Sequence, residues 1–494
     1  MAILAVLGLA AGIVLRIALW GSVLGRLDSD EAVWGLMARH VLQGDFSTFY
    51  WGQSYGGTQE VLLTAPLVLL FGLNLVVIRL VPIVLTAVAA VIVWRIGLRT
   101  VSPTSAVAAA VLFWVAPGYV LWKTTRAHGF YGSGLVLTCL TLLLALRLAE
   151  RRSRWDAAAL GLVLGLAWWE TAQIVAVAVP ALAWLVLRRP GVVRDAWLVV
   201  LAGLVGAIPW LSSNLRRDWW SFTGPASQNV QDFSHYVDHL RVFVDVHMLV
   251  NLDLRVPFTL DWSIPRPVAA LVYLALIAGV AWLGWTRRRE PISLLVVVLL
   301  VYPLIYAYSG AVWIDDEPRY VVLLTPVIAL LLAWPLRTSR RAFVVCAIAV
   351  VLSANVLADM AKPAYRARAD GQGQPTHYGP LLRFLDAKGI DHVISDYWVA
   401  YSIDFLSDER IVAGQGEMGQ LVEQDGRLFP SAASGSRHWA YYLSGVASRR
   451  TALVYAATNQ YEATERAKLL RNRYTRVPVG EFVVYLPSAV TSHP

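Results

Sequence analysis

Cysteine is almost absent from this sequence, whose 494 residues include only Cys139 and Cys346. Both lie inside apolar runs, where no oxidised pair is expected, so they indicate neither a disulfide framework nor a zinc site. Charged side chains are also scarce, at 15% of residues against 57% hydrophobic residues. This composition excludes a soluble fold of this length, because most of the chain must face lipid or other apolar segments.

The sequence also lacks the features of a cleaved leader before Asp28, namely a basic start and a small-residue cleavage pattern. The first apolar run, residues 3–24, is therefore predicted to be an uncleaved span. The formal net charge of +9 comes largely from arginines that cluster between apolar runs. Such clusters are typical of cytoplasmic loops, and we expect no nucleic-acid partner. The excess of Arg over Lys, with abundant Ala, Val and Leu, indicates a bacterial source with a GC-rich genome.

Five basic clusters divide the apolar runs into helix hairpins, at Arg95 with Arg99, 147–154, 188–194, 287–289 and 337–341. If all five lie in the cytoplasm, successive spans alternate in direction. The predicted spans are residues 3–24, 75–97, 104–122, 130–149, 157–170, 174–188, 196–213, 267–286, 291–309, 320–337 and 341–359. The predicted fold is mainly α, a bundle of about eleven spans in the bacterial cytoplasmic membrane with the C-terminus outside.

Two large outer loops follow from this topology, residues 25–74 and 214–266. Residues 31–43, 59–72 and 233–248 have the patterns of helices that lie along the membrane surface. His235 and His239 lie one turn apart on the last of these helices, and they either face solvent or hold a metal.

The hairpin at residues 157–188 has arms of about 15 residues, short of the roughly 20 needed to cross a bilayer. Its tip contains Trp168, Trp169 and Glu170. Glu170 then either lies in a water-filled cavity below the outer surface, because a carboxylate facing lipid is costly, or is exposed at the interface.

The composition changes after Asp359, and residues 362–494 are predicted to form an extracytoplasmic α/β domain, leaving residues 1–361 as the membrane domain. Strands are expected at 392–395, 410–413, 451–457 and 480–486, and helices at 377–388, 397–406 and 459–473. The sequence contains no internal repeat, and this domain has no Gly-rich phosphate loop.

Three acidic residues, Asp28, Asp30 and Glu31, directly follow the first span. They either cap the next helix and occupy its first turn, or supply a carboxylate that takes the proton of a hydroxyl at the mouth of a membrane cavity. Glu31 is expected to raise the proton affinity of Asp30, which suits a base.

Positive charge gathers at the outer junction of the third and fourth spans, where Lys123, Arg126 and His128 precede Tyr131. Because positive charge outside runs against the insertion rule, it indicates a phosphate ligand at headgroup depth, either that of a specific substrate or that of ordinary anionic lipid. Arg79, near the outer end of the second span, is predicted to join the same site.

A third polar group, residues 315–320, leads directly into the tenth span. Arg319 either pairs with its acidic neighbours or points into a cavity with Tyr320 at its apolar boundary. Asp315, Asp316 and Glu317 are also the residues that, with Asp30, would hold a divalent cation if the protein uses one.

These motifs resemble the GT-C superfamily of membrane glycosyltransferases, and within it the protein O-mannosyltransferase and lipid A aminoarabinose transferase group. The resemblance covers nearly the whole chain. The motifs that carry it are Asp30-Glu31-Ala32, Leu42-Gln43-Gly44, Leu70-Phe71-Gly72 before Arg79-Leu80, and Pro318-Arg319-Tyr320 before a helix that contains Pro326.

The resemblance implies transfer of a sugar from a polyprenyl-phosphate carrier to a glycan, lipid or protein acceptor on the outer face, with inversion. Asp30 is then the base and Glu31 its orienting neighbour. Lys123, Arg126, His128, Arg319 and Arg79 are the residues expected to bind the donor phosphate, while Asp28, Tyr131, Glu170 and Tyr320 line the cavity. The alternatives are a transporter or flippase of lipid-linked sugars and a noncatalytic scaffold, of which the first usually shows paired repeats.

Overall fold

The computed structural model describes residues 1–115, 117–223, 232–309, 316–362, 375–416, 421–424, 427–430, 451–472 and 474–487. By its internal contacts the chain forms two compact units. The helical unit contains Met1–Gly25, Gln53–Glu60 and Arg79–Tyr365, and the sheet unit contains Arg26–Gly52, Val61–Ile78 and Arg366–Pro494.

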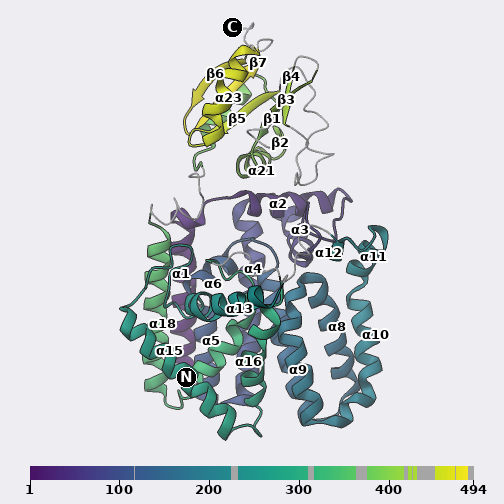
Figure 1. The fold of residues 1–494 in the computed structure, drawn as a ribbon, viewed down its shortest axis with the longest axis vertical. Coiled ribbons are helices and arrows are strands. Elements are labelled where there is room, and N and C mark those ends of the chain that lie inside the picture. The colour runs from purple at the N-terminus through teal and green to yellow at the C-terminus, as the bar shows by residue number, and fades with distance from the viewer. Residues whose placement is uncertain are drawn as a thin grey trace. The chain divides into compact units, whose positions relative to one another are not determined.

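The helical unit consists of apolar helices joined by short loops (Figure 1). Its helices include α1 (Ala2–Trp20), α4 (Leu75–Thr100), α5 (Pro103–Val115), α6 (Gly118–Thr125), α7 (Tyr131–Glu150), α8 (Arg154–Glu170), α9 (Val175–Arg188), α10 (Ala196–Gly206), α11 (Ile208–Arg216), α15 (Arg266–Thr286), α16 (Ser293–Tyr306), α17 (Thr325–Ala333) and α18 (Ser339–Met360). Between α11 and α15 lie α12 (Trp220–Thr223), α13 (Phe233–Val242) and α14 (Met248–Val250).

A multi-pass membrane protein is confirmed, but the predicted number of spans is only partly supported. Among the described residues five helices, α1, α4, α7, α15 and α18, are long and apolar enough to cross a bilayer. The number rises to seven if α5 with α6, and α9 with α10, each count as one bent span. The remaining predicted spans contain helices of 9 to 17 residues, which are shorter than the about 20 residues that a membrane helix needs.

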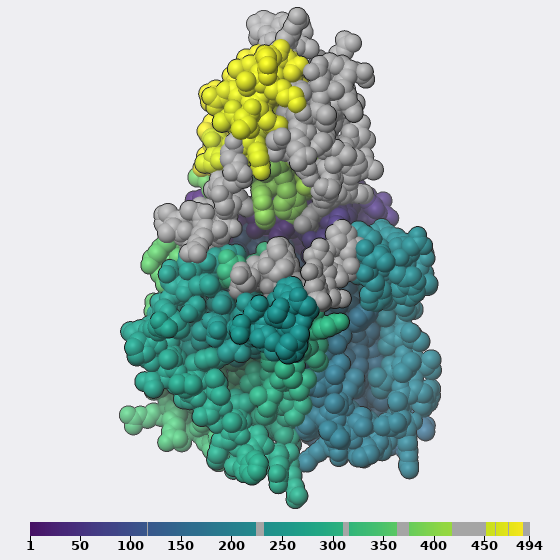
Figure 2. Space-filling view, in the orientation of Figure 1, coloured from purple at the N-terminus to yellow at the C-terminus, as the bar shows by residue number. Residues whose placement is uncertain are grey.

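Two of these short helices, α8 and α10, pack backbone against backbone through glycines. A Cβ at Gly165 would lie 2.0 Å from the carbonyl oxygen of Gly203, and one at Gly161 would lie 2.2 Å from that of Val199. Small residues four apart allow such close approach of membrane helices. In the space-filling view the side chains of this region form a continuous surface (Figure 2).

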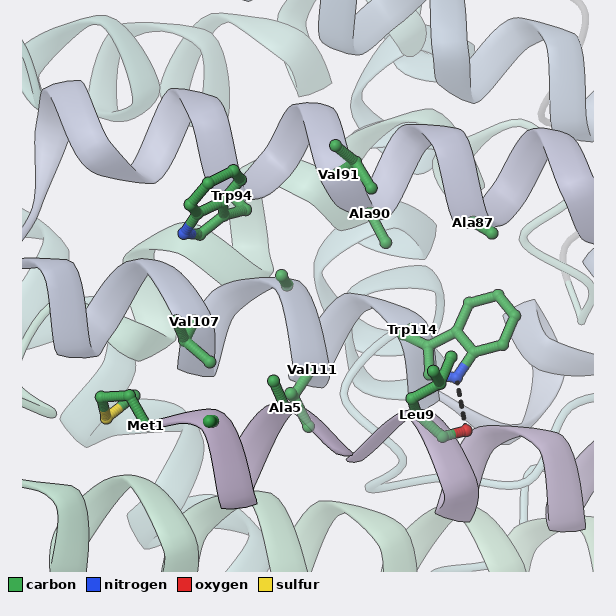
Figure 3. A pocket seen from close by; sticks show the side chains of 12 residues that line it. Met1, Ala5, Leu9, Ala87, Ala90, Val91, Trp94, Val107, Val111 and Trp114 are labelled. Carbon is green, nitrogen blue, oxygen red and sulfur yellow. Dashed lines mark hydrogen bonds between the residues drawn. The ribbon is translucent and has the colours of Figure 1, made fainter. Parts of the chain in front are cut away.

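An apolar cavity of about 430 Å³ lies between α1, α4 and α5 (Figure 3). Its walls include Leu9, Val91 and Trp114, and the indole N–H of Trp114 donates to the carbonyl of Leu9 at 3.1 Å. Seven residues beyond Leu9 in α1, the buried guanidinium of Arg16 stacks on Trp114 and donates to the carbonyls of Gly12 and Trp114, each at 3.0 Å.

The sheet unit contains a mixed five-stranded sheet with the order β2-β1-β5-β7-β6. The strands are β1 (His392–Ser395), β2 (Val412–Gln415), β5 (Ala452–Ala456), β6 (Tyr474–Val479) and β7 (Phe482–Pro487), and a separate hairpin pairs β3 (Leu421–Gln424) with β4 (Arg427–Pro430). β1 runs parallel to β2 and β5, whereas β7 runs antiparallel to β5 and β6.

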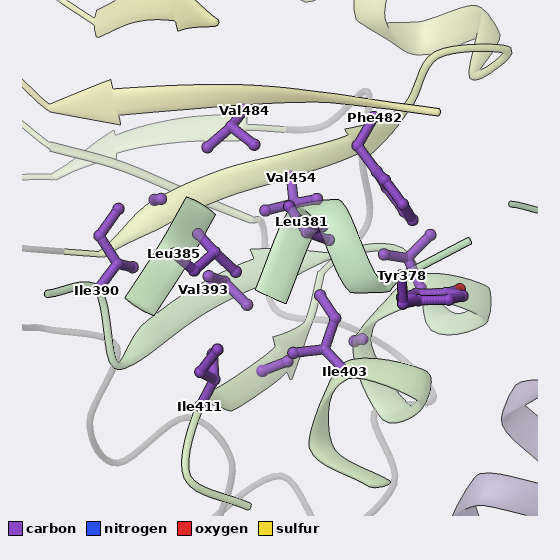
Figure 4. Packing of buried hydrophobic residues seen from close by; sticks show 14 of the residues in the cluster. Tyr378, Leu381, Leu385, Ile390, Val393, Ile403, Ile411, Val454, Phe482 and Val484 are labelled. Atoms are coloured by element: carbon purple, nitrogen blue, oxygen red, sulfur yellow. The ribbon is translucent and has the colours of Figure 1, made fainter. Parts of the chain in front are cut away.

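Alternate residues of the central strands point to opposite faces, so the sheet has two apolar faces. Val393, Val454 and Val484 pack with α20 (Gly379–Ala387) and α21 (Tyr397–Leu406), as Figure 4 shows for several of these residues. Their neighbours along each strand, such as Ile394 and Tyr485, pack with Leu469 of α23 (Gln460–Arg471). The predicted α/β pattern is confirmed, while β6 and the β3–β4 hairpin were not predicted.

Two helices from the first predicted outer loop complete this unit. α2 (Ser29–Leu42) lies entirely within it, and α3 (Gln59–Phe71) belongs to it from Val61 onward. Both correspond to helices predicted from the sequence. The predicted domain boundary near residue 362 stays a prediction, because residues 363–374 lie outside the described part of the chain.

Candidate functional site

A buried ion-pair cluster joins α6 to the segment before α17. Lys123 of α6 is 6% exposed, and its Nζ lies 2.7 Å from Oε1 of Glu317. The hydroxyl of Tyr119, one helical turn earlier, donates to the same oxygen at 2.9 Å. The two polar groups that the sequence places almost 200 positions apart are therefore one site in the fold.

Arg319 pairs with the other oxygen of Glu317, so the interpretation in which it pairs with an acidic neighbour is confirmed. Burial alone would raise the pKa of Glu317, but the nearby Lys123 and Arg319 outweigh it and lower the pKa to about 2. The carboxylate is thus ionised at neutral pH against two cations. The side chain of Arg319 is 39% exposed, whereas Lys123 and Glu317 are buried, so Arg319 is the member that a ligand can reach.

Aromatic rings surround the same cluster. The ammonium of Lys123 lies 4.6 Å from the ring centre of Trp122, and the guanidinium of Arg126 lies 5.7 Å from it. His128 packs edge-on against Trp122, with ring centres 5.3 Å apart. An aromatic ring attracts a cation but has no net charge, so it does not neutralise the cation as a carboxylate would. A cation held in this way can still attract an anion.

Further predicted site residues lie at the beginning of α7. Phe130 stacks on Tyr320 with ring centres 5.9 Å apart, and Tyr131 is 5% exposed with its ring centre 5.7 Å from the Lys123 ammonium. The structure therefore brings together Lys123, Arg126, His128, Tyr131, Arg319 and Tyr320. Arg79 is 3% exposed near the beginning of α4, and its part in the site stays a prediction.

The N-terminus of α6 is held from outside the helix. Pro117 precedes it and offers no capping side chain, and the N–H of Gly118 instead donates to Oδ1 of Asp253 at 2.8 Å. The other carboxylate oxygen of Asp253 accepts a hydrogen bond from Ser353 of α18 at 2.8 Å. This contact fixes the helix that carries Lys123.

Glu170 is fully buried against other protein groups, so the alternative of an exposed hairpin tip is wrong. Its carboxylate accepts from the hydroxyl of Ser133, which also donates to Oε1 of Glu60 at 3.0 Å. The main-chain N–H of Gly57 donates to the Glu170 carbonyl at 2.9 Å, and a Cβ at Gly57 would lie 2.6 Å from that carboxylate. Glu60 and Ser133 were not predicted, although a glutamate in the first turn of an apolar helix was a usable signal.

The acidic residues after the first span lie in the sheet unit. Asp28 caps α2, because its Oδ1 accepts from the N–H of Glu31 at 3.0 Å, which confirms the capping interpretation for this residue. Glu31 is fully buried. The Asp30 carboxylate accepts a hydrogen bond from Tyr397 of α21, and its main-chain carbonyl accepts one from Tyr50 at 2.9 Å. Tyr397 was not predicted, since nothing in the sequence links the two segments.

Metal binding finds little support in the described ranges, where no group of three or more His, Cys, Asp or Glu side chains is placed to hold an ion. Asp315 lies outside those ranges, so its predicted part in a divalent-cation site is not described. Nδ1 of His239 lies 2.8 Å from the carbonyl oxygen of Ala307, and the His239 ring packs edge-on against His235 with ring centres 4.2 Å apart.

Residues 62–212 match the family described as dolichyl-phosphate-mannose-protein mannosyltransferase. Among solved structures, the chain is similar to ArnT from Cupriavidus metallidurans bound to undecaprenyl phosphate, with 13% identity, a TM-score of 0.64 and coverage of 99% of both chains. The apo structure of the same protein gives 13% identity, a TM-score of 0.62 and coverage of 99% and 98%. No curated protein sequence matches the chain.

The chain therefore has the fold of ArnT. The resemblance inferred from the sequence motifs is thereby confirmed. The family match, residues 62–212, contains Arg79, the Lys123–Tyr131 segment and Glu170. The likeness in fold to ArnT extends over 99% of the chain.

Proposed function

We propose that the protein is an inverting glycosyltransferase that moves a sugar from a polyprenyl-phosphate carrier to an acceptor on the extracytoplasmic face. The observation that carries this proposal is the cluster of Lys123, Arg126 and Arg319 around Trp122 and Glu317. These side chains gather three cations in one cluster, and cations of this kind bind a phosphate monoester or diester. The undecaprenyl phosphate bound by ArnT, which has the same fold, supports this class of ligand.

In the proposed reaction a hydroxyl oxygen of the acceptor attacks the anomeric carbon of the donor sugar. The bond from that carbon to the phosphate oxygen breaks, and its electron pair leaves with polyprenyl phosphate. The hydroxyl proton passes to the carboxylate of Asp30, while Glu31 orients Asp30. The cations, with His128 and Arg79, stabilise the charge that develops on the departing phosphate, so this oxygen needs no proton donor.

The topology supports placing the base and the tail domain on one side of the membrane. α2 carries Asp30 and follows the first span, and the tail sheet follows the last helix of the helical unit, yet both belong to the sheet unit. One compact unit cannot lie on both sides of a bilayer, so the chain crosses the membrane an even number of times between α2 and the tail sheet. With the first span added, the total number of crossings is odd, as the charge pattern predicts. A cytoplasmic N-terminus would place this unit outside.

The base assignment is tested by transfer from labelled polyprenyl-phosphate sugars to cell-envelope acceptors. Purified wild-type protein, Asp30→Asn and the control Asp238→Asn are compared, since Asp238 is exposed and pairs only with Arg241 among the ion pairs described. We expect Asp30→Asn to reduce kcat by about 10²- to 10⁴-fold, the usual contribution of a general base. Transfer by the folded Asp30→Asn variant at the wild-type rate would refute the assignment.

The phosphate assignment is tested by binding of undecaprenyl phosphate and of phosphatidylglycerol to Arg126→Ala and to the exposed control Arg241→Ala. A hydrogen bond to a charged group contributes about 1.5–3 kcal/mol, so its loss in Arg126→Ala should weaken the affinity for undecaprenyl phosphate roughly 10- to 150-fold. Arg241→Ala should keep the wild-type affinity. Equal weakening for both lipids would favour a general headgroup site. Lipid movement between leaflets without any sugar transfer by the wild type would favour the flippase alternative.

A further inference from the structure

Helices α2 and α21 come from opposite ends of the chain and lie side by side within the sheet unit. Contacts join them in the same order along both helices. Asp30 pairs with Tyr397, Gly35 faces Phe405, and Arg39 reaches the turn that follows α21. The two helices therefore run in the same direction over about 14 Å, the length of nine helical residues.

The middle contact requires a glycine. A Cβ at Gly35 would lie 2.5 Å from Cε2 of Phe405 and 3.0 Å from Cδ1 of Leu73. Because real Cβ contacts are not this short, a larger residue would separate α2 from α21. Gly35 thus sets the distance between the two helices, including the distance between the beginning of α21 and the beginning of α2, which carries Asp30.

The far ends of the two helices are joined by ion pairs. Asp408 and Glu409 follow α21 in left-handed conformations, with φ of 57° and 58°. Nε of Arg39 lies 3.1 Å from Oε2 of Glu409, and Nε2 of His40 lies 2.7 Å from Oε1 of the same residue. Glu409 and His40 are both buried, so this end of the pair of helices is a fixed contact rather than a surface encounter.

At the near end, Tyr397 is the first residue of α21 and its side chain is placed by its neighbours. The helix is capped by Asp396, whose carboxylate accepts from the N–H of Trp398 at 2.9 Å and from Asn459 at 3.1 Å. The Tyr397 ring packs edge-on against Tyr401, with ring centres 5.4 Å apart. A hydroxyl held in this way can fix the plane of the carboxylate to which it donates.

We infer that Tyr397 of the tail domain is a positioning residue for the catalytic carboxylate of Asp30, and hence that the tail domain is part of the active site. This inference rests on the proposed function. A base is effective only when its carboxylate is aligned with the hydroxyl that loses its proton, and misplacement by about 1 Å can cost 10²-fold in rate. The hydrogen bond from Tyr397 supplies this alignment without contacting the substrate.

The test compares steady-state transfer by Tyr397→Phe with that by Tyr401→Phe in the full-length protein. Tyr401→Phe is a matched control, because it removes a hydroxyl from the same helix, one that lies 3.4 Å from Gln415 of β2, and keeps the ring that packs against Tyr397. We expect Tyr397→Phe to lower kcat about 10- to 100-fold with the donor KM unchanged within about twofold. Tyr401→Phe is expected to keep the wild-type kcat. Gly35→Val, which separates the helices without touching Tyr397, is expected to lower kcat in the same way.

Several outcomes would overturn the inference, and they differ from failure of the proposed function. If Asp30→Asn abolishes transfer while Tyr397→Phe keeps the wild-type kcat, the function stands and Tyr397 has no role in it. If Tyr397→Phe and Tyr401→Phe lose kcat equally, the loss reflects the fold of the domain and not alignment of Asp30. If the wild type transfers no sugar from any polyprenyl-phosphate donor, the proposed function fails and the inference fails with it.

Discussion

The buried cluster of Lys123, Glu317 and Arg319 allows a prediction in which a second substitution increases the free energy of unfolding that the first has lowered. Glu317→Gln keeps the shape of the side chain but removes the negative charge that Lys123 and Arg319 share. The variant leaves a buried ammonium 2.7 Å from a neutral amide. We expect adding Lys123→Met to Glu317→Gln to restore part of the lost stability, although each change by itself is destabilising.

The magnitude follows from the distance and the burial. At 2.7 Å and an effective dielectric constant of about 20, Coulomb's law gives an attraction of roughly 6 kcal/mol, most of which offsets the cost of burying both ions. Breaking a buried pair from one side costs about 3–5 kcal/mol. Lys123→Met costs less, because Arg319 still neutralises Glu317. In the double variant Arg319 loses its ion pair with Glu317, but the side chain of Arg319 is 39% exposed.

The assay is equilibrium unfolding of the detergent-purified protein in SDS, followed by tryptophan fluorescence, for the wild type, both single variants and the double variant. The expected coupling free energy is about 2–3 kcal/mol, the upper part of the range for contacting residues. Arg241 and Asp238 form an exposed pair and serve as the control cycle, in which coupling should stay below about 1 kcal/mol. Strict additivity of Lys123→Met and Glu317→Gln would refute the buried pair.

Three further outcomes are expected. Gly165→Leu should destabilise the protein by more than about 2 kcal/mol in the same SDS titration, since its Cβ would meet the carbonyl of Gly203, whereas Gly191→Leu, with open space around it, should be neutral. Ser133→Ala should cost about 1–3 kcal/mol, because its hydroxyl serves two buried carboxyl groups. In the sheet unit, two arginines and a tyrosine outweigh burial and lower the pKa of Glu462 to about 2. The stabilising contribution of Glu462 is therefore present above about pH 4.3 and is lost as the pH falls toward 2. In the wild type the protection of the β7 amides against hydrogen exchange should fall over this pH range, and in Glu462→Gln it should change less.

Most of the helices were predictable from local pattern. The predicted helix at 397–406 coincides with α21, the helix at 31–43 corresponds to α2, and the strand at 392–395 is β1. These segments have an apolar period or a clear beginning, and such signals act over a few residues. β6 was not predicted because its Thr475-Arg476 and Val477-Pro478 steps do not alternate cleanly, and its partner β7 supplies the ordering.

The candidate site was predicted as three separate groups of residues. Their chemistry was visible, since Lys123, Arg319 and Asp30 are charged residues beside apolar runs. Their partners could not be predicted from the sequence, because Glu317 lies almost 200 positions from Lys123 and Tyr397 lies 367 positions from Asp30. Of the predicted spans, the described helices support five to seven by length and composition, because charge alternation counts apolar runs without regard to helix length.

The sequence by itself determined that this is a multi-pass membrane protein with an α/β tail and with charged residues beside its spans. Hydrophobicity, periodicity and charge are properties of short stretches, and they survive in any fold that the chain adopts. Only the tertiary structure decided that Glu317 neutralises Lys123 and Arg319, and that Tyr397 holds Asp30. Those pairings depend on how distant helices pack, through close contacts such as Gly35 with Phe405, and no local pattern records that packing.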